Sequence, residues 1–191
     1  MRKNIIIIIL GMLVCVLLAL RLTTPDTYIN DHVETERKFL LNTESLLDFD
    51  SLTEKHEFVQ TYINYSPEMR VRKVTNALGV EYYFTIKLPQ DEIGLSRHEI
   101  EVKITEQEYE ELLKKQVGTT IYKTRYQFVE NGFYMSVDVY SHELLTLSVA
   151  EVEFSSVAES EKYSPPSWFG EEVTSDKRYK NANLAKDGLP R

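Results

Sequence analysis

Cysteine is almost absent from this chain of 191 residues, and its single copy, Cys15, lies within an apolar N-terminal run. No internal disulfide can form, and neither a thiolate metal cluster nor thiol catalysis is credible. The four histidines lack ligand-like spacing, which argues against a zinc site. Basic charge is also scarce. The net charge of -8 argues against a general nucleic-acid binder, because counterion release requires a basic surface.

The N-terminal apolar run covers residues 5–20 and follows Arg2 and Lys3. As a helix it would be about 24 Å long, slightly short of a bilayer core of about 30 Å, and snorkelling of Arg21 lets Leu22 extend it. A cleavable signal peptide is the alternative, but no small-residue cleavage pattern follows the run. We expect residues 1–22 to be an uncleaved, single-pass transmembrane helix. The flanking basic residues favour an N-terminus inside and a domain on the extracytoplasmic side.

The remaining composition predicts one globular domain. With 42% apolar and 27% charged residues, a chain of this length has enough apolar residues to form a hydrophobic core. Residues 23–32 are polar and contain Pro25, as expected of a short linker. We therefore expect the domain to span residues 33–186 and a tail to span 187–191.

Three stretches of this domain predict helices. The apolar spacing within residues 43–65 favours two short helices. Thr105 and Glu108 form a capping-box pattern, which predicts a helix over 105–115. A last helix is expected over about 175–186.

The other segments alternate charged and apolar residues, as strands with one charged face do. The charged positions comprise seven acids and seven bases: Glu34, Glu36, Glu99, Glu101, Asp138, Glu151 and Glu153, with Lys38, Arg70, Arg72, Lys87, Arg97, Lys123 and Arg125. Any one of these segments is most simply the solvated face of an antiparallel sheet. The pattern alone does not distinguish an outer wet face from the inner wall of a barrel.

The composition of the charged face points beyond a simple wet surface, because few Ser, Gln or Asn residues dilute its charges. If the sheet closes, the charges converge on a lumen. Clustered carboxylates would bind hard divalent cations such as Mg²⁺ or Mn²⁺, which prefer oxygen ligands. Rows of Arg and Lys would bind a polyanion through phosphate oxygens. A site with both features suits a metal-chelated polyphosphate.

The stretch E-T-E-R-K-F-L at residues 34–40 resembles the ExExK signature of the CYTH superfamily, the triphosphate tunnel metalloenzymes. Seven further motifs agree in order: R-V-R, T-I-K, S-R-H-E-I-E, Y-K-T-R-Y, V-D-V-Y, A-E-V-E-F and W-F-G-E-E-V-T-S-D-K-R-Y-K-N. The resemblance implies an α+β fold, in which an eight-stranded antiparallel β-barrel encloses a tunnel and helices pack outside. The last motif looks most like the small bacterial inorganic triphosphatases.

The resemblance also implies roles for individual residues. Glu34, Glu36, Glu151 and Glu153 resemble the main metal-binding acids, and Glu99, Glu101 and Asp138 resemble acids that complete the metal sites or orient water. The residues that resemble the triphosphate clamp are Lys38, Arg70, Arg72, Lys87, Arg97, Lys123 and Arg125. Gln60-Thr61-Tyr62 resembles a Q-x-Y element, so Tyr62 would act with Lys38 on a phosphate oxygen or water. A half-buried structural tyrosine is the alternative interpretation of Tyr62.

The expected reaction is metal-dependent hydrolysis of inorganic triphosphate to phosphate and pyrophosphate, with Mg²⁺ or Mn²⁺ as cofactor. The partners are then a triphosphate-containing small molecule and, through the N-terminal helix, a membrane. Thiamine triphosphate hydrolysis, nucleoside triphosphate hydrolysis and adenylate cyclase activity stay open as alternatives. A membrane-tethered polyphosphate-binding module without turnover is the alternative outside enzymes.

Overall fold

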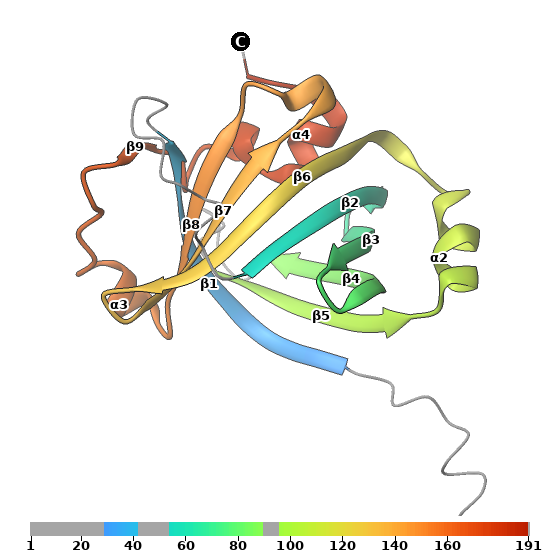
Figure 1. Ribbon diagram of the computed structural model, residues 1–191, viewed down its shortest axis with the longest axis horizontal. Coiled ribbons are helices and arrows are strands. Elements are labelled where there is room, and N and C mark those ends of the chain that lie inside the picture. The colour runs from blue at the N-terminus through green and yellow to red at the C-terminus, as the bar shows by residue number, and fades with distance from the viewer. Residues whose placement is uncertain (1–28, 42–53, 90–95, 191) are drawn as a thin grey trace, which may run out of the picture.

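A closed β-barrel forms the body of the protein. The computed structural model describes residues 29–41, 54–89 and 96–190. Eight strands follow one another in the order β5-β4-β3-β2-β6-β7-β8-β1, and pairing of β1 with β5 closes the sheet (Figure 1). Every pairing is antiparallel, so the predicted eight-stranded antiparallel barrel is confirmed. The strands are β1 Ile29–Leu41, β2 Glu54–Tyr65, β3 Glu68–Asn76, β4 Gly79–Pro89, β5 Ser96–Ile104, β6 Val117–Glu130, β7 Phe133–Tyr140 and β8 Ser148–Glu153.

Short elements surround the barrel. A small strand, β9, pairs with β1 beyond the closed sheet. In Figure 1, α2 stands at the side of the barrel formed by β3–β5, α3 lies at the opposite side, and α4 lies beside β6 and β7. These elements are α2 Glu106–Leu113, η2 His142–Leu144, α3 Val157–Ser160, β9 Phe169–Glu172, η3 Lys177–Tyr179 and α4 Asn181–Asp187.

The hydrophobic core is divided between the outer face of the barrel and one of its ends. On the outer face, residues of β7, β8 and β1 pack with Phe169 of β9, and the Phe39 and Phe169 rings lie 4.7 Å apart. At one end, Tyr62, Ile121 and Tyr140 pack with Leu184 of α4. This second cluster, called the apolar plug, consists of Tyr62, Ile121, Tyr140, Leu144, Leu147, Val149, Ala182, Leu184 and Ala185. Helix α4 therefore covers one end of the barrel.

The predicted capping box is present at the start of α2. The Thr105 hydroxyl accepts a hydrogen bond from the Glu108 backbone N–H at 3.2 Å, and the Glu108 carboxylate accepts one from the Thr105 N–H at 2.7 Å. The two bonds satisfy backbone donors that the first helical turn would otherwise leave unpaired. The helix predicted over 105–115 is thus confirmed as α2.

Two other helix predictions require correction. Residues 54–65 form strand β2, not a helix, because Phe58, Gln60 and Tyr62 alternate toward one side of the sheet; the rest of the predicted pair, residues 43–53, lies outside the described residues. The predicted C-terminal helix is interrupted at Lys180, whose ψ of 135° is extended, so η3 and α4 are separate. Local apolar spacing did not reveal either feature.

The predicted transmembrane helix and most of the linker fall in residues 1–28, which lie outside the described residues. Within the described residues, no helix has both the length and the hydropathy needed to cross a membrane.

Gly118, at the start of β6, fixes how closely α4 approaches the barrel. Its φ is +68°, and a Cβ atom there would collide with the Tyr65 hydroxyl and lie 2.5 Å from the Ala185 carbonyl oxygen. We expect Gly118→Ala to lower the free energy of unfolding by about 2–4 kcal/mol, through backbone strain and overpacking. Urea unfolding measures this loss.

Gly79 provides the matched control, because its φ of +137° is also positive but nothing lies within 4 Å of an added Cβ. Gly79→Ala should therefore cost only the backbone strain. Equal losses from the two variants would show that the contact with α4 is unimportant.

Candidate active site

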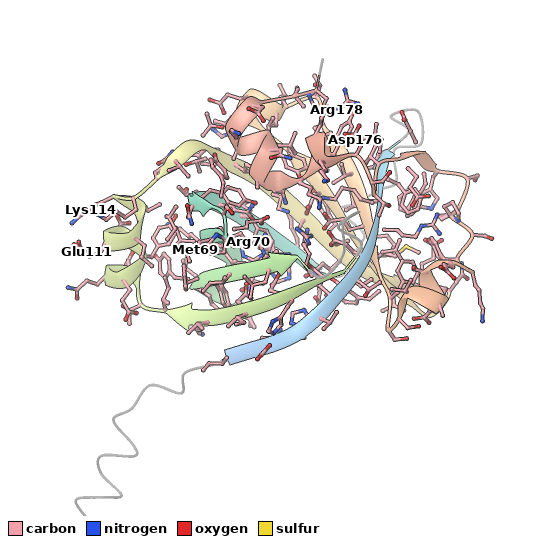
Figure 2. All side chains as sticks on the ribbon, turned by 180° about the vertical axis from the view of Figure 1, so that it is seen from behind. Met69, Arg70, Glu111, Lys114, Asp176 and Arg178 are labelled. Atoms are coloured by element: carbon pink, nitrogen blue, oxygen red, sulfur yellow. The ribbon has the colours of Figure 1, made fainter. Side chains whose placement is uncertain are left out.

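The barrel encloses a charged cavity of about 330 Å³, called the bore. Every residue predicted for the site lines the bore except Asp138; those lining it are Glu34, Glu36, Lys38, Tyr62, Arg70, Arg72, Lys87, Arg97, Glu99, Glu101, Lys123, Arg125, Glu151 and Glu153. In Figure 2, Arg70 lies among the strands, whereas the Glu111–Lys114 and Asp176–Arg178 pairs lie on the outer surface. The charged face of the alternating strands is therefore the inner wall of the barrel.

Acids and bases in the bore form ion pairs across neighbouring strands. Lys87 Nζ lies 2.6 Å from Glu34 and 2.5 Å from Glu99. Arg97 lies 2.8 Å from Glu36 and 3.4 Å from Glu34. Burial alone would raise the pKa of Glu34, but the charges of Lys87 and Arg97 lower it overall. These pairs hold both kinds of charge in the bore when no ligand is bound.

A second group of pairs is centred on Glu151 of β8. Its carboxylate lies 2.8 Å from Lys38 Nζ and 2.6 Å from Arg125. Burial opposes ionisation of Glu151, yet Lys38 and Arg125 together hold its pKa well below the usual range. The backbone of Lys38 is held from outside, because its N–H donates to Thr174 Oγ1 at 3.0 Å and its carbonyl accepts from the Val173 N–H at 2.8 Å. The segment after β9 thus positions the β1 end of this group.

Arg70 and Arg72 alternate along β3 and face the acids of β5. Arg70 lies 3.6 Å from Glu99, and Arg72 forms an ion pair with Glu101. The Nε atoms of both arginines are buried without a hydrogen-bond partner. Each guanidinium therefore keeps donor capacity for an anion in the bore.

Asp138 lies behind the wall of the bore instead of on its surface. It is 0% exposed, and its two oxygens accept from Arg125 at 2.6 and 2.7 Å and also from Lys123. Burial alone would raise the pKa of Asp138, but Arg125 and Lys123 lower it overall. Burial and the neighbouring Arg125 lower the pKa of Lys123 to about 8. In this structure Asp138 positions two bases, whereas the sequence resemblance implied a metal-related acid.

Glu36 and Glu153 face one another directly on β1 and β8. Burial, together with the charges of Glu34 and Glu151, raises the pKa of Glu36. Glu153 forms no ion pair within the described residues, and although its side chain is exposed at the mouth of the bore, loss of hydration and the charge of Glu34 raise its pKa to about 7. Arg97 is therefore the ion-pair partner of Glu36, whereas Glu153 faces Glu36 without a base of its own among the described residues.

The donor chemistry at Glu36 and Glu153 fits a hard divalent cation. Carboxylate oxygens are the ligands that Mg²⁺ and Mn²⁺ prefer, and a cation would relieve the repulsion between the two acids. In the described part of the chain, however, no three Asp, Glu, His or Cys side chains converge closely enough to hold a metal. The acids pair with bases instead, so metal binding would require at least one of them to rotate away from its base.

Tyr62 lies on β2 and is completely buried. Its hydroxyl accepts a hydrogen bond from Gln60 Nε2 at 2.9 Å. Burial and the charge of Glu68 raise the pKa of Tyr62, so the phenol stays protonated at neutral pH. Tyr62 and Lys38 both line the bore, but Lys38 pairs with Glu151 instead of with the tyrosine. Tyr62 can thus orient a ligand oxygen but is not a general base.

Several residues that line the bore were absent from the predicted site. Glu68 shares the alternation of Arg70 and Arg72, and this spacing could have revealed it. Lys180, between η3 and α4, lines the bore and forms no ion pair with the described residues. The remaining lining residues are mostly uncharged: Asn30, His32, Gln127, Tyr134 and Asn181. No charge pattern marks these positions.

Comparison with known proteins assigns the family. A model of the CYTH domain matches residues 32–188, which is most of the chain. The chain belongs to the CYTH domain family. This CYTH protein is 39% identical over 153 residues to an inorganic triphosphatase of Nitrosomonas europaea, covering 80% of this chain and 96% of that one. It is 35% identical over 156 residues to an inorganic triphosphatase of Acetivibrio thermocellus, covering 81% and 94%.

The CYTH barrel also resembles a solved structure. The crystal structure of an inorganic triphosphatase matches it with a TM-score of 0.57 at 34% identity, covering 82% of this chain and 97% of that chain. The agreement extends over nearly the whole length of the relative. Sequence and fold therefore support the same family.

Proposed function

We propose that this CYTH protein is a metal-dependent inorganic triphosphatase, which hydrolyses inorganic triphosphate to phosphate and pyrophosphate in the bore. The observation that carries the proposal is the convergence of eight bases and seven acids on one cavity of about 330 Å³. A chain of phosphates offers many oxygens to the bases, while the acids suit a divalent cation. The names of both relatives, which match over most of their length, support this substrate.

The substrate would be held by the bases of five strands, β1, β3, β4, β5 and β6, and of the segment before α4. Arginine can bind two phosphate oxygens in parallel, whereas lysine acts as a point charge. The proposed clamp consists of Lys38, Arg70, Arg72, Lys87, Arg97, Lys123, Arg125 and, in addition, Lys180. Hydrolysis transfers a terminal phosphoryl group to water, and the bases would stabilise the negative charge that spreads over the phosphate oxygens.

Glu34, Glu36 and Glu153 are the acids best placed to hold Mg²⁺ or Mn²⁺, and Glu151, Glu99 and Glu101 are further candidates. All of them except Glu153 would first have to leave a base. When bound, the ion would supply a concentrated positive charge beside the phosphates and would make water more acidic. Both ions prefer oxygen ligands, so the acids of the bore suit either.

Metal and triphosphate should bind cooperatively, because each base that lines the bore on a strand is paired with an acid. A triphosphate must replace those acids as the partner of the bases. A divalent cation that takes up the acids releases the bases for the substrate. By linkage, each ligand then raises the affinity for the other by the same factor.

Lys38 and Tyr62 have separate tasks in this mechanism. Burial opposes the charge on Lys38, but Glu151 and Glu36 raise its pKa overall, so the ammonium is kept and serves as a cation. The Tyr62 hydroxyl, already accepting from Gln60, can donate its proton in a hydrogen bond to a phosphate oxygen. Neither group removes the proton from the attacking water.

The proposed function is tested by phosphate release from the purified full-length chain. Inorganic triphosphate, ATP and thiamine triphosphate are compared in Mg²⁺, in Mn²⁺ and in EDTA. We expect metal-dependent release that is fastest from inorganic triphosphate. Binding of inorganic triphosphate without release in either metal would contradict hydrolysis and indicate a binding module, and faster release from another triphosphate would change the substrate.

Lys180 offers a prediction at the α4 end of the bore. We expect Lys180→Gln to raise KM for inorganic triphosphate about three- to tenfold with little change in kcat, because an unpaired lysine would contribute binding charge without touching the reacting water. Lys177→Gln is the matched control, since Lys177 is exposed in η3 and does not line the bore. An equal effect from both variants would mean that only long-range charge matters.

The location of the domain is a separate proposal. Residues 1–22 would anchor the protein with its N-terminus inside and the barrel on the extracytoplasmic side, and the support is the apolar run and the two basic residues before it. A C-terminal tag should be accessible to protease in spheroplasts. A tag that is cleaved only after lysis would reverse the orientation, and a fully soluble chain would remove the anchor.

A further inference from the structure

One segment of the barrel wall, residues 58–62 of β2, carries no charge, and only its Tyr62 lines the bore. On β2 the side chains that face inward from Phe58 to Tyr62 are Phe58, Gln60 and Tyr62, while the two neighbouring strands, β3 and β6, carry pairs of bases. The Gln60 side chain donates a hydrogen bond to the Tyr62 hydroxyl, and the Phe58 side chain has no polar atom. The Phe58 residue is largely buried, with 9% of its surface exposed. It lies between the bases of β3 and those of β6.

Three cations surround the Phe58 ring. Arg72 Cζ and Arg125 Cζ each lie 5.6 Å from the ring centroid, and Lys123 Nζ lies 5.5 Å from it. All three belong to the wall of the bore, whereas the ring itself lies behind them. An aromatic face attracts cations within about 6 Å, and the attraction is stronger where water is excluded.

The Phe58 ring offsets the repulsion among the three cations around it. Three cations close together repel one another, and the acids that pair with them are Glu101, Asp138 and Glu151. If metal and substrate draw Glu101 or Glu151 away, only Asp138, which is fully buried, keeps two of the bases in place. The Phe58 ring attracts the same three cations. Unlike a carboxylate, the ring has no proton to gain and is not a ligand for Mg²⁺ or Mn²⁺, so it stays beside the cations when the acids leave.

We propose that Phe58 is a positioning residue for the phosphate clamp: its ring holds Arg72, Lys123 and Arg125 aimed into the bore when their acid partners turn to other ligands. The proposal rests on the proposed function only in its choice of triphosphate as the anion. An aliphatic residue would fill the same space and exclude water but would not attract the cations. The aromatic character of this position, beyond its size, therefore controls anion affinity.

The test compares Phe58→Leu and Phe58→Met, which keep an apolar side chain, with Phe58→Tyr, which keeps the ring. The readouts are binding of a hydrolysis-resistant imido analogue of triphosphate in Mg²⁺, measured by calorimetry, and KM and kcat for inorganic triphosphate. We expect Leu and Met to weaken analogue binding and to raise KM by about five- to twentyfold, with kcat changed less than about threefold. Phe58→Tyr should stay within about threefold of the unmodified protein.

Phe39→Leu is the matched control. Phe39 is buried, and Arg37 Cζ lies 5.1 Å from its ring, but neither residue lines the bore. Its loss should lower the free energy of unfolding without changing analogue affinity. The proposal is overturned if Phe58→Leu and Phe58→Met bind the analogue normally, or if Phe39→Leu weakens binding as much. Analogue binding without phosphate release by the unmodified protein would sink the proposed function alone, whereas absence of binding would sink both.

Discussion

Glu36→Gln is expected to lower kcat/KM for inorganic triphosphate at least about a hundredfold while making the metal-free protein more stable. The loss of activity follows because the substitution removes a central carboxylate of the proposed metal site. The gain in stability follows from the raised pKa of Glu36, which means that the fold disfavours its charge. When the pKa of a carboxyl group is higher in the folded protein than in the unfolded chain, the free energy of unfolding falls as the pH rises and the group ionises. The uncharged amide of Glu36→Gln avoids this loss, so the variant should be more stable at pH 8.

Phosphate release and urea unfolding in EDTA at pH 8 measure the two effects. Glu110→Gln is a suitable control, because Glu110 lies exposed on α2, away from the bore. We expect this control to change neither quantity appreciably. Full activity of Glu36→Gln would remove Glu36 from the metal site. A less stable metal-free variant would show that the ion pair of Glu36 with Arg97 outweighs its burial and its repulsion by Glu34 and Glu151.

Asp138→Asn is expected to lower the free energy of unfolding by about 3–5 kcal/mol, because removal of the acid leaves Lys123 without its partner and Arg125 with Glu151 alone. Urea unfolding in EDTA measures this loss. If Asp138 only positions the bases, Mn²⁺ affinity of the folded variant, measured by calorimetry, should change less than about threefold. Triphosphate affinity should fall, since the two bases lose their orientation.

An exposed pair provides the comparison for Asp138. Asp176 lies 2.6 Å from Arg178 at the outer surface (Figure 2), so Asp176→Asn should lower the free energy of unfolding much less than Asp138→Asn. A stable Asp138→Asn variant with a large loss of Mn²⁺ affinity would restore the metal-related role implied by the family resemblance. Large losses in both variants would show that the fold tolerates no missing carboxylate.

The charged lining of the bore could be predicted from the sequence because strand geometry is periodic. Residues two apart, such as Arg70 and Arg72 or Glu99 and Glu101, share a face whatever the fold around them. Closure of the sheet is a different matter. The pairing of Ile29 with Val102 that joins the barrel edges depends on partners distant in sequence, and only the family resemblance indicated it.

Two features of the site could not be predicted from the sequence: the burial of Asp138 behind its bases and the role of the uncharged Phe58. Alternation assigns Asp138 to the inner face, but it does not show that Lys123 and Arg125 cover the carboxylate. The sequence gives no indication of a role for Phe58, because its segment has apolar residues at helical spacing and no charge between Phe58 and Tyr62. Contacts made by uncharged residues leave little periodic signal, so the aromatic side of the clamp appears only in three dimensions.

The apolar plug under α4 has a consequence for the length of the molecules that the protein can process. At that end, Tyr62, Ile121 and Leu184 pack together among the described residues, with Lys180 and Asn181 reaching the bore beside them. We expect this packing to close the barrel axis to a long polymer. A long phosphate polymer could then not be threaded through the protein or cut at internal bonds. Only a free chain end could reach the bases, and both products would have to depart by the route of entry. Long polymers would shorten from their ends, one short piece at a time.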